Sequence, residues 1–147
     1  YIRDSREALD FQSEESSQKI LKSVERYLLV MLGGAIGAAL RYGLGAWVQG
    51  LSGPGFPWST FLINVTGSFL IGLVLRLSLE GALSPEWRLF LAVGVLGGYT
   101  TFSTFSWETL TLVQQGEWFK AFLYVAGSVL LGFALVWLAY RWAGRWV

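Results

Sequence analysis

The sequence predicts an all-α membrane protein of four transmembrane helices, the third of which is broken. The chain is 54% hydrophobic, with a mean hydropathy of +0.50. It contains four apolar segments, each longer than the roughly 20 residues that cross a bilayer core. One of them holds the polar run Gly-Val-Leu-Gly-Gly-Tyr-Thr-Thr-Phe-Ser-Thr-Phe, residues 94–105. Non-helical backbone survives at membrane depth only where protein or water covers it, so this run predicts a lined site or pore in a small channel or transporter.

The four segments are joined by short connections, which predicts that successive helices lie antiparallel. Their expected bounds are 27–51, 58–79, 87–114 and 118–142, and a dense turn signal fills 52–57. Four spans place both termini on one side of the membrane. Basic residues gather there, namely Lys19, Lys22, Arg26, Arg76, Arg88, Arg141 and Arg145. Only Arg41 and Lys120 lie toward the other side, so both termini are predicted in the cytoplasm and the protein in the cell (inner) membrane.

Residues 1–26 form a region distinct from the transmembrane domain, 27–147. They carry about half of the charged residues of the chain, of both signs, and lack the apolar core of a signal peptide. Two interpretations stay open. The region is either a cytosolic tail or a fusion remnant, and Ile20, Leu21 and Val24 could make part of it an amphipathic helix that runs into the membrane.

Composition excludes several classes of function. The chain has no cysteine and no histidine, which removes disulfides, thiolate ligands and the usual general base. A net charge of +1 without a basic stripe argues against nucleic-acid binding. No Ser/Thr nucleophile with a recognisable base is found, so an enzyme is not predicted. In the first span, Gly33 and Gly37 are either a close-packing face or part of a generic glycine-rich helix.

Polar residues inside the spans are the candidate functional residues, because such residues are costly in a membrane. Arg41 either attracts an anion into a vestibule or extends its guanidinium to the headgroups. Asn64 offers donors to an anion or a hydrogen bond to another helix. Glu108 is a proton-coupled site, a vestibule residue, a partner for a hydroxyl or Tyr, or an acid at the interface. Tyr124 and Ser128, spaced i, i+4, face one cavity or serve in packing.

The third span offers the densest polar pattern. A break after Gly97-Gly98 would free backbone carbonyls that can hold a small cation such as Na⁺. It would also free N–H groups, which together with hydroxyls can donate to an anion. Phe102 and Phe105, three residues apart, lie on one helix face, where the positive ring edges could face an anion. Ordinary aromatic packing is the alternative.

Three sequence blocks resemble the Fluc/CrcB fluoride channels. They are Gly-Gly-Ala-Ile-Gly-Ala-Ala-Leu-Arg-Tyr (33–42), Phe-Leu-Ile-Asn-Val-Thr-Gly-Ser-Phe (61–69) and Gly-Gly-Tyr-Thr-Thr-Phe-Ser-Thr-Phe (97–105). The resemblance covers residues 27–147. It implies an antiparallel, dual-topology homodimer with two pores that export cytoplasmic fluoride passively and so confer fluoride resistance. It also implies a structural Na⁺ at the dimer centre, held by the backbone carbonyls of Gly97 and Thr100.

The resemblance assigns a fluoride pathway as well. It implies that the pathway is lined by Arg41, Asn64, Phe102, Ser103, Thr104 and Phe105, with Glu108 and Tyr124 near it. Ser128, one helical turn after Tyr124, is expected to join them. Two departures from the family pattern stand out. The charged tail enlarges the orientation bias, which conflicts with equal insertion in both directions, and Ser59 and Phe61 replace an expected Gly and Leu.

Two other classes of membrane protein compete with this interpretation. A small multidrug exporter, also of four spans, needs a carboxylate in the first span, and 27–51 contains none. A structural or assembly subunit fits the glycine-rich helices but leaves the run of hydroxyls and phenylalanines unexplained.

Overall fold

The computed structural model describes the backbone of residues 2–146 and the side chains of residue 12 and residues 14–146. It is all-helical within that range. The elements are α1 (Ile2–Ser52), α2 (Trp58–Leu79), α3 (Pro85–Arg88), the π-helix η1 (Leu89–Leu96), α4 (Gly97–Tyr99), α5 (Phe102–Gln114) and α6 (Trp118–Ala143). The short elements α3, η1 and α4 follow without a gap and form the first half of the third span, whose second half is α5. Four spans in the described chain are long and apolar enough to cross a membrane, as predicted.

The spans match their expected bounds except at the N-terminus. Helix α2 covers the predicted range, and α6 ends one residue later than predicted. Helix α1 begins at Ile2, so the charged region is helical and continues into the first span. The three apolar side chains that could make this region an amphipathic helix are all exposed: Ile20, Leu21 and Val24. The side chains of Arg3, Asp4, Arg6, Glu7 and Asp10 lie outside the described residues.

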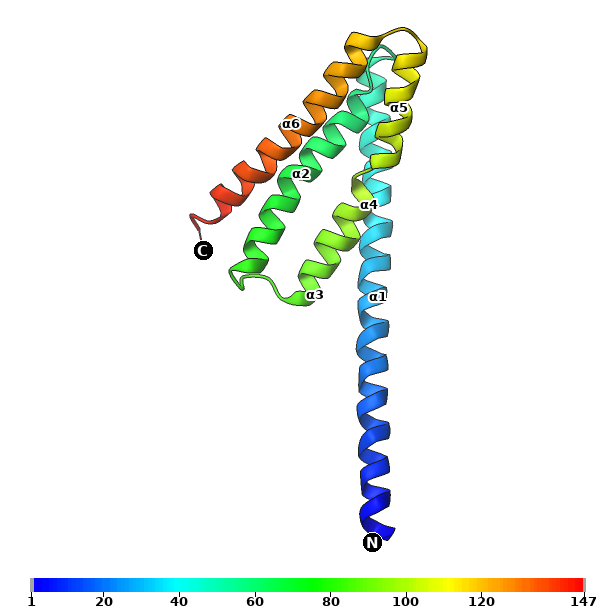
Figure 1. The fold of residues 1–147 in the computed structure, drawn as a ribbon, viewed down its shortest axis with the longest axis vertical. Coiled ribbons are helices and arrows are strands. Elements are labelled where there is room, and N and C mark those ends of the chain that lie inside the picture. Colours follow the sequence, from blue (N-terminus) through cyan, green and yellow to red (C-terminus); the bar gives the residue numbers. More distant parts are fainter. Residues whose placement is uncertain (1, 147) are drawn as a thin grey trace.

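Figure 1 shows successive spans running in opposite directions, as predicted, with both ends of the chain on the same side of the bundle. Consequently α2 and α6 run in the same direction, and α1 runs parallel to the third span. Helix α2 packs chiefly against α6, while α1 packs chiefly against η1 and α4. The N-terminal half of α1 extends beyond the other helices. Each of the three connections contains a glycine with positive φ, at Gly53, Gly81 and Gly116, a conformation that side chains other than hydrogen disfavour.

Helix α1 and the third span touch through backbone atoms. A Cβ added at Gly37 would overlap the carbonyl oxygen of Val95, and one added at Gly33 would lie 2.9 Å from the Cα of Gly94. Such close approach is the known use of small residues between membrane helices. Of the two interpretations of Gly33 and Gly37, close packing is therefore confirmed.

The predicted break in the third span is present. Gly97 and Gly98 remain helical, while Thr100 and Thr101 are extended, with φ, ψ of −80°, 158° and −150°, 120°. The break thus begins at Thr100, past the glycine pair that the sequence pattern indicates. Gly98 serves close packing instead, because a Cβ there would lie 2.5 Å from the carbonyl oxygen of Gly34. Glycine is needed at this position because a side chain would not fit against α1, and its backbone does not adopt a conformation restricted to glycine.

Candidate ion pathway at the break in the third span

Asn64 on α2 clamps the broken backbone. Its Nδ2 donates to the carbonyl oxygen of Thr101 at 3.0 Å, and its Oδ1 accepts from the N–H of Thr101 at 2.9 Å. The amide thus replaces the helical acceptor that the N–H of Thr101 loses at the break, and it adds a second donor to the Thr101 carbonyl, which as the N-cap of α5 already accepts a helical bond. The interhelical hydrogen bond, one of the two interpretations of Asn64, is confirmed. An amide carries two N–H donors, so one of them remains for a second partner.

The break redirects two N–H groups away from the helix axis. In an unbroken helix the N–H of Thr101 would bond to the carbonyl of Gly97, and that of Thr104 to the carbonyl of Thr100. In the structure the N–H of Thr101 goes to Asn64, and the N–H of Thr104 goes to the side-chain oxygen of Thr101 at 3.3 Å. The carbonyls of Gly97 and Thr100 therefore lose their helical donors, and hard oxygen atoms of this kind suit a small cation.

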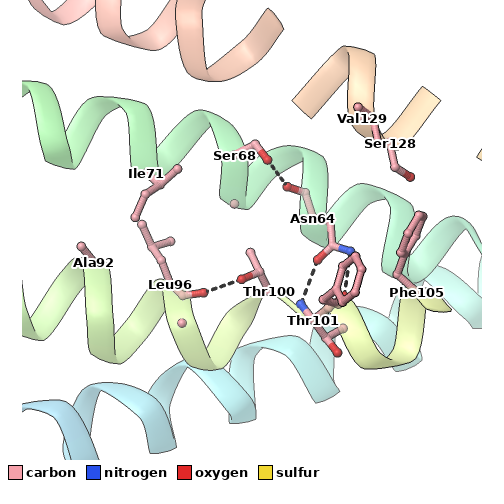
Figure 2. Close-up of a pocket in the computed structure, with 13 residues that line it drawn as sticks. Asn64, Ser68, Ile71, Ala92, Leu96, Thr100, Thr101, Phe105, Ser128 and Val129 are labelled. Carbon is pink, nitrogen blue, oxygen red and sulfur yellow. Dashed lines mark hydrogen bonds between the residues drawn. The ribbon is translucent and has the colours of Figure 1, made fainter. Parts of the chain in front are cut away.

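The phenylalanines of α5 lie together beside Asn64. The ring centroids of Phe102 and Phe105 are 5.8 Å apart with planes tilted by 37°. Both rings line a cavity of about 420 Å³ together with Asn64 and Ser128 (Figure 2). Phe105 also packs on Tyr124, at 5.0 Å between centroids. Phe102 is 79% exposed.

Glu108 is held by two hydroxyl groups. Thr60 Oγ1 donates to its Oε1 at 2.9 Å, and the Tyr124 hydroxyl donates to its Oε2 at 2.6 Å. Among the four alternatives for Glu108, the hydroxyl partner is confirmed. Tyr124 itself is fully buried, so it supports Glu108 rather than facing open space with Ser128.

A second cavity, of about 460 Å³, lies on the Glu108 side of the break. Its wall includes Arg41 of α1 together with Thr60, Thr104 and Glu108. Arg41 and Glu108, a basic and an acidic residue, therefore line the same cavity. Thr101 lines this cavity and the first one, which makes the break itself the boundary between them.

The predicted site residues thus fall into two groups around one break. The first cavity is lined by Asn64, Gly97, Thr100, Phe102, Phe105 and Ser128, and the second by Arg41, Thr104 and Glu108. Ser103 lines neither; its hydroxyl is 3.3 Å from Thr101 Oγ1, and it is exposed. Tyr124 joins the second group through its hydrogen bond to Glu108.

Three residues of the site are not among the predicted pathway residues. Thr60 precedes Asn64 by one helical turn, and Ser68 follows by one, so their i, i+4 spacing along α2 was a usable signal. Thr101 is the N-cap of α5, where its side chain accepts the N–H of Thr104. Threonine is a favoured N-cap, and this preference marks the start of α5 better than the glycines do.

Comparison with known proteins agrees with this geometry. Residues 28–140 match the sequence profile described as CrcB-like protein, Camphor Resistance (CrcB). The chain is 69% identical over 124 residues to a fluoride-specific ion channel FluC of Thermus thermophilus, covering 84% of this chain and 98% of the relative. It is 50% identical over 117 residues to FluC of Oceanobacillus iheyensis, covering 79% and 89%. FluC of Rhizobium meliloti is 49% identical over 111 residues, covering 74% and 88%.

These matches confirm the resemblance and decide the class of protein. The relatives are ion channels, so the prediction that the chain is not an enzyme is confirmed as well. The four apolar spans make it a multi-pass membrane protein. The chain therefore belongs to the CrcB-like family, which includes these fluoride-specific channels.

Proposed function

We propose that this chain is a fluoride-selective channel that exports cytoplasmic fluoride passively. The observation that carries the proposal is the pair of cavities that meet at the break in the third span, lined by Asn64, Phe102 and Phe105 on one side and by Arg41 and Glu108 on the other. A relative that the match covers almost entirely is named for the same ion.

Fluoride is small and strongly hydrated, so a pore must replace the water that it loses with donors. The second N–H of the Asn64 amide and the hydroxyls of Ser128 and Thr104 can supply them. Ring edges carry the positive part of the aromatic quadrupole, and Phe102 and Phe105 would offer them where donors are sparse. Arg41 would raise the local concentration of anions at the mouth.

Passive flow suffices for export. An inside-negative potential of about 100 mV favours the exit of one negative charge by about 2.3 kcal/mol, equivalent to a gradient of roughly fiftyfold. No Gly-x-x-x-x-Gly-Lys-Ser/Thr phosphate-binding motif is found in the sequence. The membrane potential therefore provides enough driving force without nucleotide hydrolysis.

The pore requires a second copy in this proposal. Phe102 projects from the break with most of its surface uncovered, and a single chain does not enclose the cavity. An antiparallel, dual-topology homodimer would close the cavity and create two pores. Large apolar residues exposed along all four spans leave surface for both lipid and the second copy.

A structural Na⁺ is part of the proposal. The carbonyls of Gly97 and Thr100, which lose their helical donors, would hold the ion. Bound there, it would supply a positive charge that balances the partial negative end of the preceding helix. The melting temperature of the dimer is expected to be lower in choline chloride than in sodium chloride of equal ionic strength. Equal values would argue against the ion.

Efflux from liposomes tests the central proposal. Purified protein is reconstituted, and the vesicles are loaded with fluoride or with chloride. Fast fluoride efflux with little chloride efflux is expected. Absence of fluoride efflux from folded protein would refute the proposal, and proton-coupled efflux of cationic drugs would favour an exporter instead.

A further inference from the structure

A third cavity lies at the end of the bundle where both termini lie. It measures about 300 Å³ and lies between α1 and the start of the third span, with a wall formed by Arg26, Pro85, Glu86, Arg88, Leu89 and Val93. Figure 1 shows α3 beside α1 at this end of the bundle, where the N-terminal half of α1 leaves the other helices. The cavity shares no residue with the two cavities at the break, so it is separate from the proposed ion pathway.

This cavity lies at the level of the lipid headgroups. Arg26 directly precedes the predicted first span, and Arg88 ends α3, the first turn of the third span. Because α1 runs parallel to the third span, both spans enter the bilayer at this end. Trp87, next to Arg88, is 57% exposed, and tryptophans gather at the interface between membrane and water. An occupant of the cavity would therefore lie at the bilayer surface.

Two arginines from different spans line the cavity. Neither the Arg26 nor the Arg88 guanidinium forms a hydrogen bond or an ion pair with another residue that the structure describes. Arg76, at the same end of the bundle, is by contrast paired with Glu80 and bonded to the Tyr140 hydroxyl. A guanidinium presents a planar fork of N–H donors that fits a phosphate group. Arg26 and Arg88 are therefore available to hold one phosphate between them.

The charges around the cavity fit a single phosphate diester. Glu86 is the one acidic residue in the wall, and it is close enough to Arg26 for their charges to interact without an ion pair. Two guanidinium groups against one carboxylate leave one positive charge, which a phosphate diester balances. Lys22 lies one helical turn before Arg26 and adds a positive charge nearby, whereas Glu25 directly precedes Arg26 and faces another side of α1. The ammonium of a zwitterionic headgroup would add a further positive charge, so a lipid of net negative charge fits better.

The wall of the cavity becomes apolar along the third span. Leu89 and Val93 continue it from Arg88 along η1, toward the membrane interior, and Val93 is 55% exposed. A soluble phosphate has no group to place against these side chains, whereas the acyl chains of a phospholipid begin directly below its phosphate. The sequence of charged mouth and apolar wall therefore matches a membrane phospholipid.

We propose that this cavity binds one anionic phospholipid, whose phosphate bridges Arg26 of α1 and Arg88 of the third span while an acyl chain lies along Leu89 and Val93. Basic pockets between membrane helices at the cytoplasmic side are a known kind of site for acidic headgroups. Bound there, the lipid would join α1 to the first half of the third span outside their glycine contacts. Lipid binding does not require fluoride conduction, and its failure would leave the proposed function intact.

The first experiment counts bound lipid. Native mass spectrometry of the purified protein in detergent, with dioleoyl phosphatidylglycerol added, is expected to show a retained lipid. Arg26→Gln combined with Arg88→Gln is expected to lower the lipid-bound fraction at least fivefold. Arg141→Gln combined with Arg145→Gln is the matched control, because it removes the same charge at the same end from exposed residues that line none of the three cavities. Equal retention by the two double variants, or no retention by wild type, would overturn the site.

A second experiment distinguishes a lipid from a soluble phosphate. The melting temperature of wild type is measured with phosphatidylglycerol, with phosphatidylcholine of the same chains, and with inorganic phosphate. The rise is expected to be largest with phosphatidylglycerol and to disappear in the Arg26→Gln, Arg88→Gln variant. An equal rise with inorganic phosphate would make a soluble anion the ligand, and an equal rise with phosphatidylcholine would show that net charge plays no part. Either result would overturn the proposal.

A third experiment keeps both arginines, so that it decides the question even where their removal disturbs folding. Val93→Ser is expected to lower retention of phosphatidylglycerol at least threefold, because it removes apolar wall beneath the phosphate. Leu138→Ser is the control, since Leu138 is 50% exposed on α6 and lines none of the three cavities. Equal retention by these two variants would refute the lipid site.

Discussion

At the scale of single residues, the side chain of Asn64 has two tasks. Both ends of its amide are bound to the backbone of Thr101, which fixes the break. One N–H remains, and the side chain lines the first cavity. The residue that shapes the pore can therefore also touch the ion. This double role explains why one amide stands at the centre of the site.

Asn64→Asp should abolish fluoride efflux. A carboxylate retains the bond from the N–H of Thr101 and loses only the additional donor to the Thr101 carbonyl, which as the N-cap of α5 still accepts a helical bond. It also opposes an anion at ~4 Å with about 4 kcal/mol at an effective dielectric constant of about 20, which slows passage about a thousandfold. Liposome efflux measures the change, with the exposed amide exchange Gln115→Glu as the control. Retention of wild-type flux would contradict the assignment of Asn64 to the pore.

Phe102→Ile should lower fluoride efflux by at least tenfold without changing the stability of the protein. Within one chain the ring is mostly exposed, so little packing inside the chain is lost, whereas the polarised ring edge is removed. Phe133→Ile is a fitting control, because Phe133 is 76% exposed and lines neither cavity. Efflux and melting temperature are compared for the three proteins. If both variants conduct equally well, the ring edge is not part of the pathway.

At the scale of elements, the break depends on how closely α1 approaches the third span. Gly33 and Gly37 lie against the backbone of η1 and α4, immediately before the extended residues. π-helices such as η1 are rare in proteins, and those that do occur are often found at functional sites. The packing of α1 therefore holds the first half of the third span at the position from which Thr100 can turn out of the helix.

Gly37→Ala and Gly34→Ala should have opposite effects on stability. The added Cβ at Gly37 would overlap the carbonyl oxygen of Val95, whereas one at Gly34 meets no atom within 4 Å. Overpacking of this kind costs about 1–3 kcal/mol, while alanine is favoured over glycine in a helix by up to about 1 kcal/mol. Thermal unfolding in detergent, followed by circular dichroism, is expected to give a lower midpoint only for Gly37→Ala. A fall of equal size in both variants would contradict the packing argument.

Elements and site differ in how far the sequence predicts them. The bounds of α2 and α6 follow from hydropathy, because apolar length alone determines a membrane span. The start of the break does not, because it depends on a bond between Thr101 and Asn64, 37 residues apart in the chain. The partner of Glu108 was one of several alternatives for the same reason. Contacts between spans are not encoded in the composition of either span.

At the scale of the whole molecule, the proposed antiparallel dimer requires copies in both orientations. Basic residues are concentrated at the end of the bundle where the two termini lie. Lys19, Lys22 and Arg26 add to this asymmetry within a few residues of the first span, where positive charge affects orientation most. The tail region thus favours the orientation with cytoplasmic termini over its opposite.

Replacing these charges should bring the two orientations closer to equal numbers. The triple variant Lys19→Gln, Lys22→Gln, Arg26→Gln is compared with Glu14→Gln, Glu15→Gln, Glu25→Gln, which removes three acidic residues from the same stretch. Because acidic residues contribute little to orientation, only the first variant is expected to change the proportion of the two orientations.

The chain has no cysteine, so a single Gln115→Cys in the exposed α5–α6 connection reports the orientation through an impermeant thiol reagent. External labelling should fall toward half in the first variant and remain higher in the second. Equal labelling in both would mean that the tail does not set the orientation.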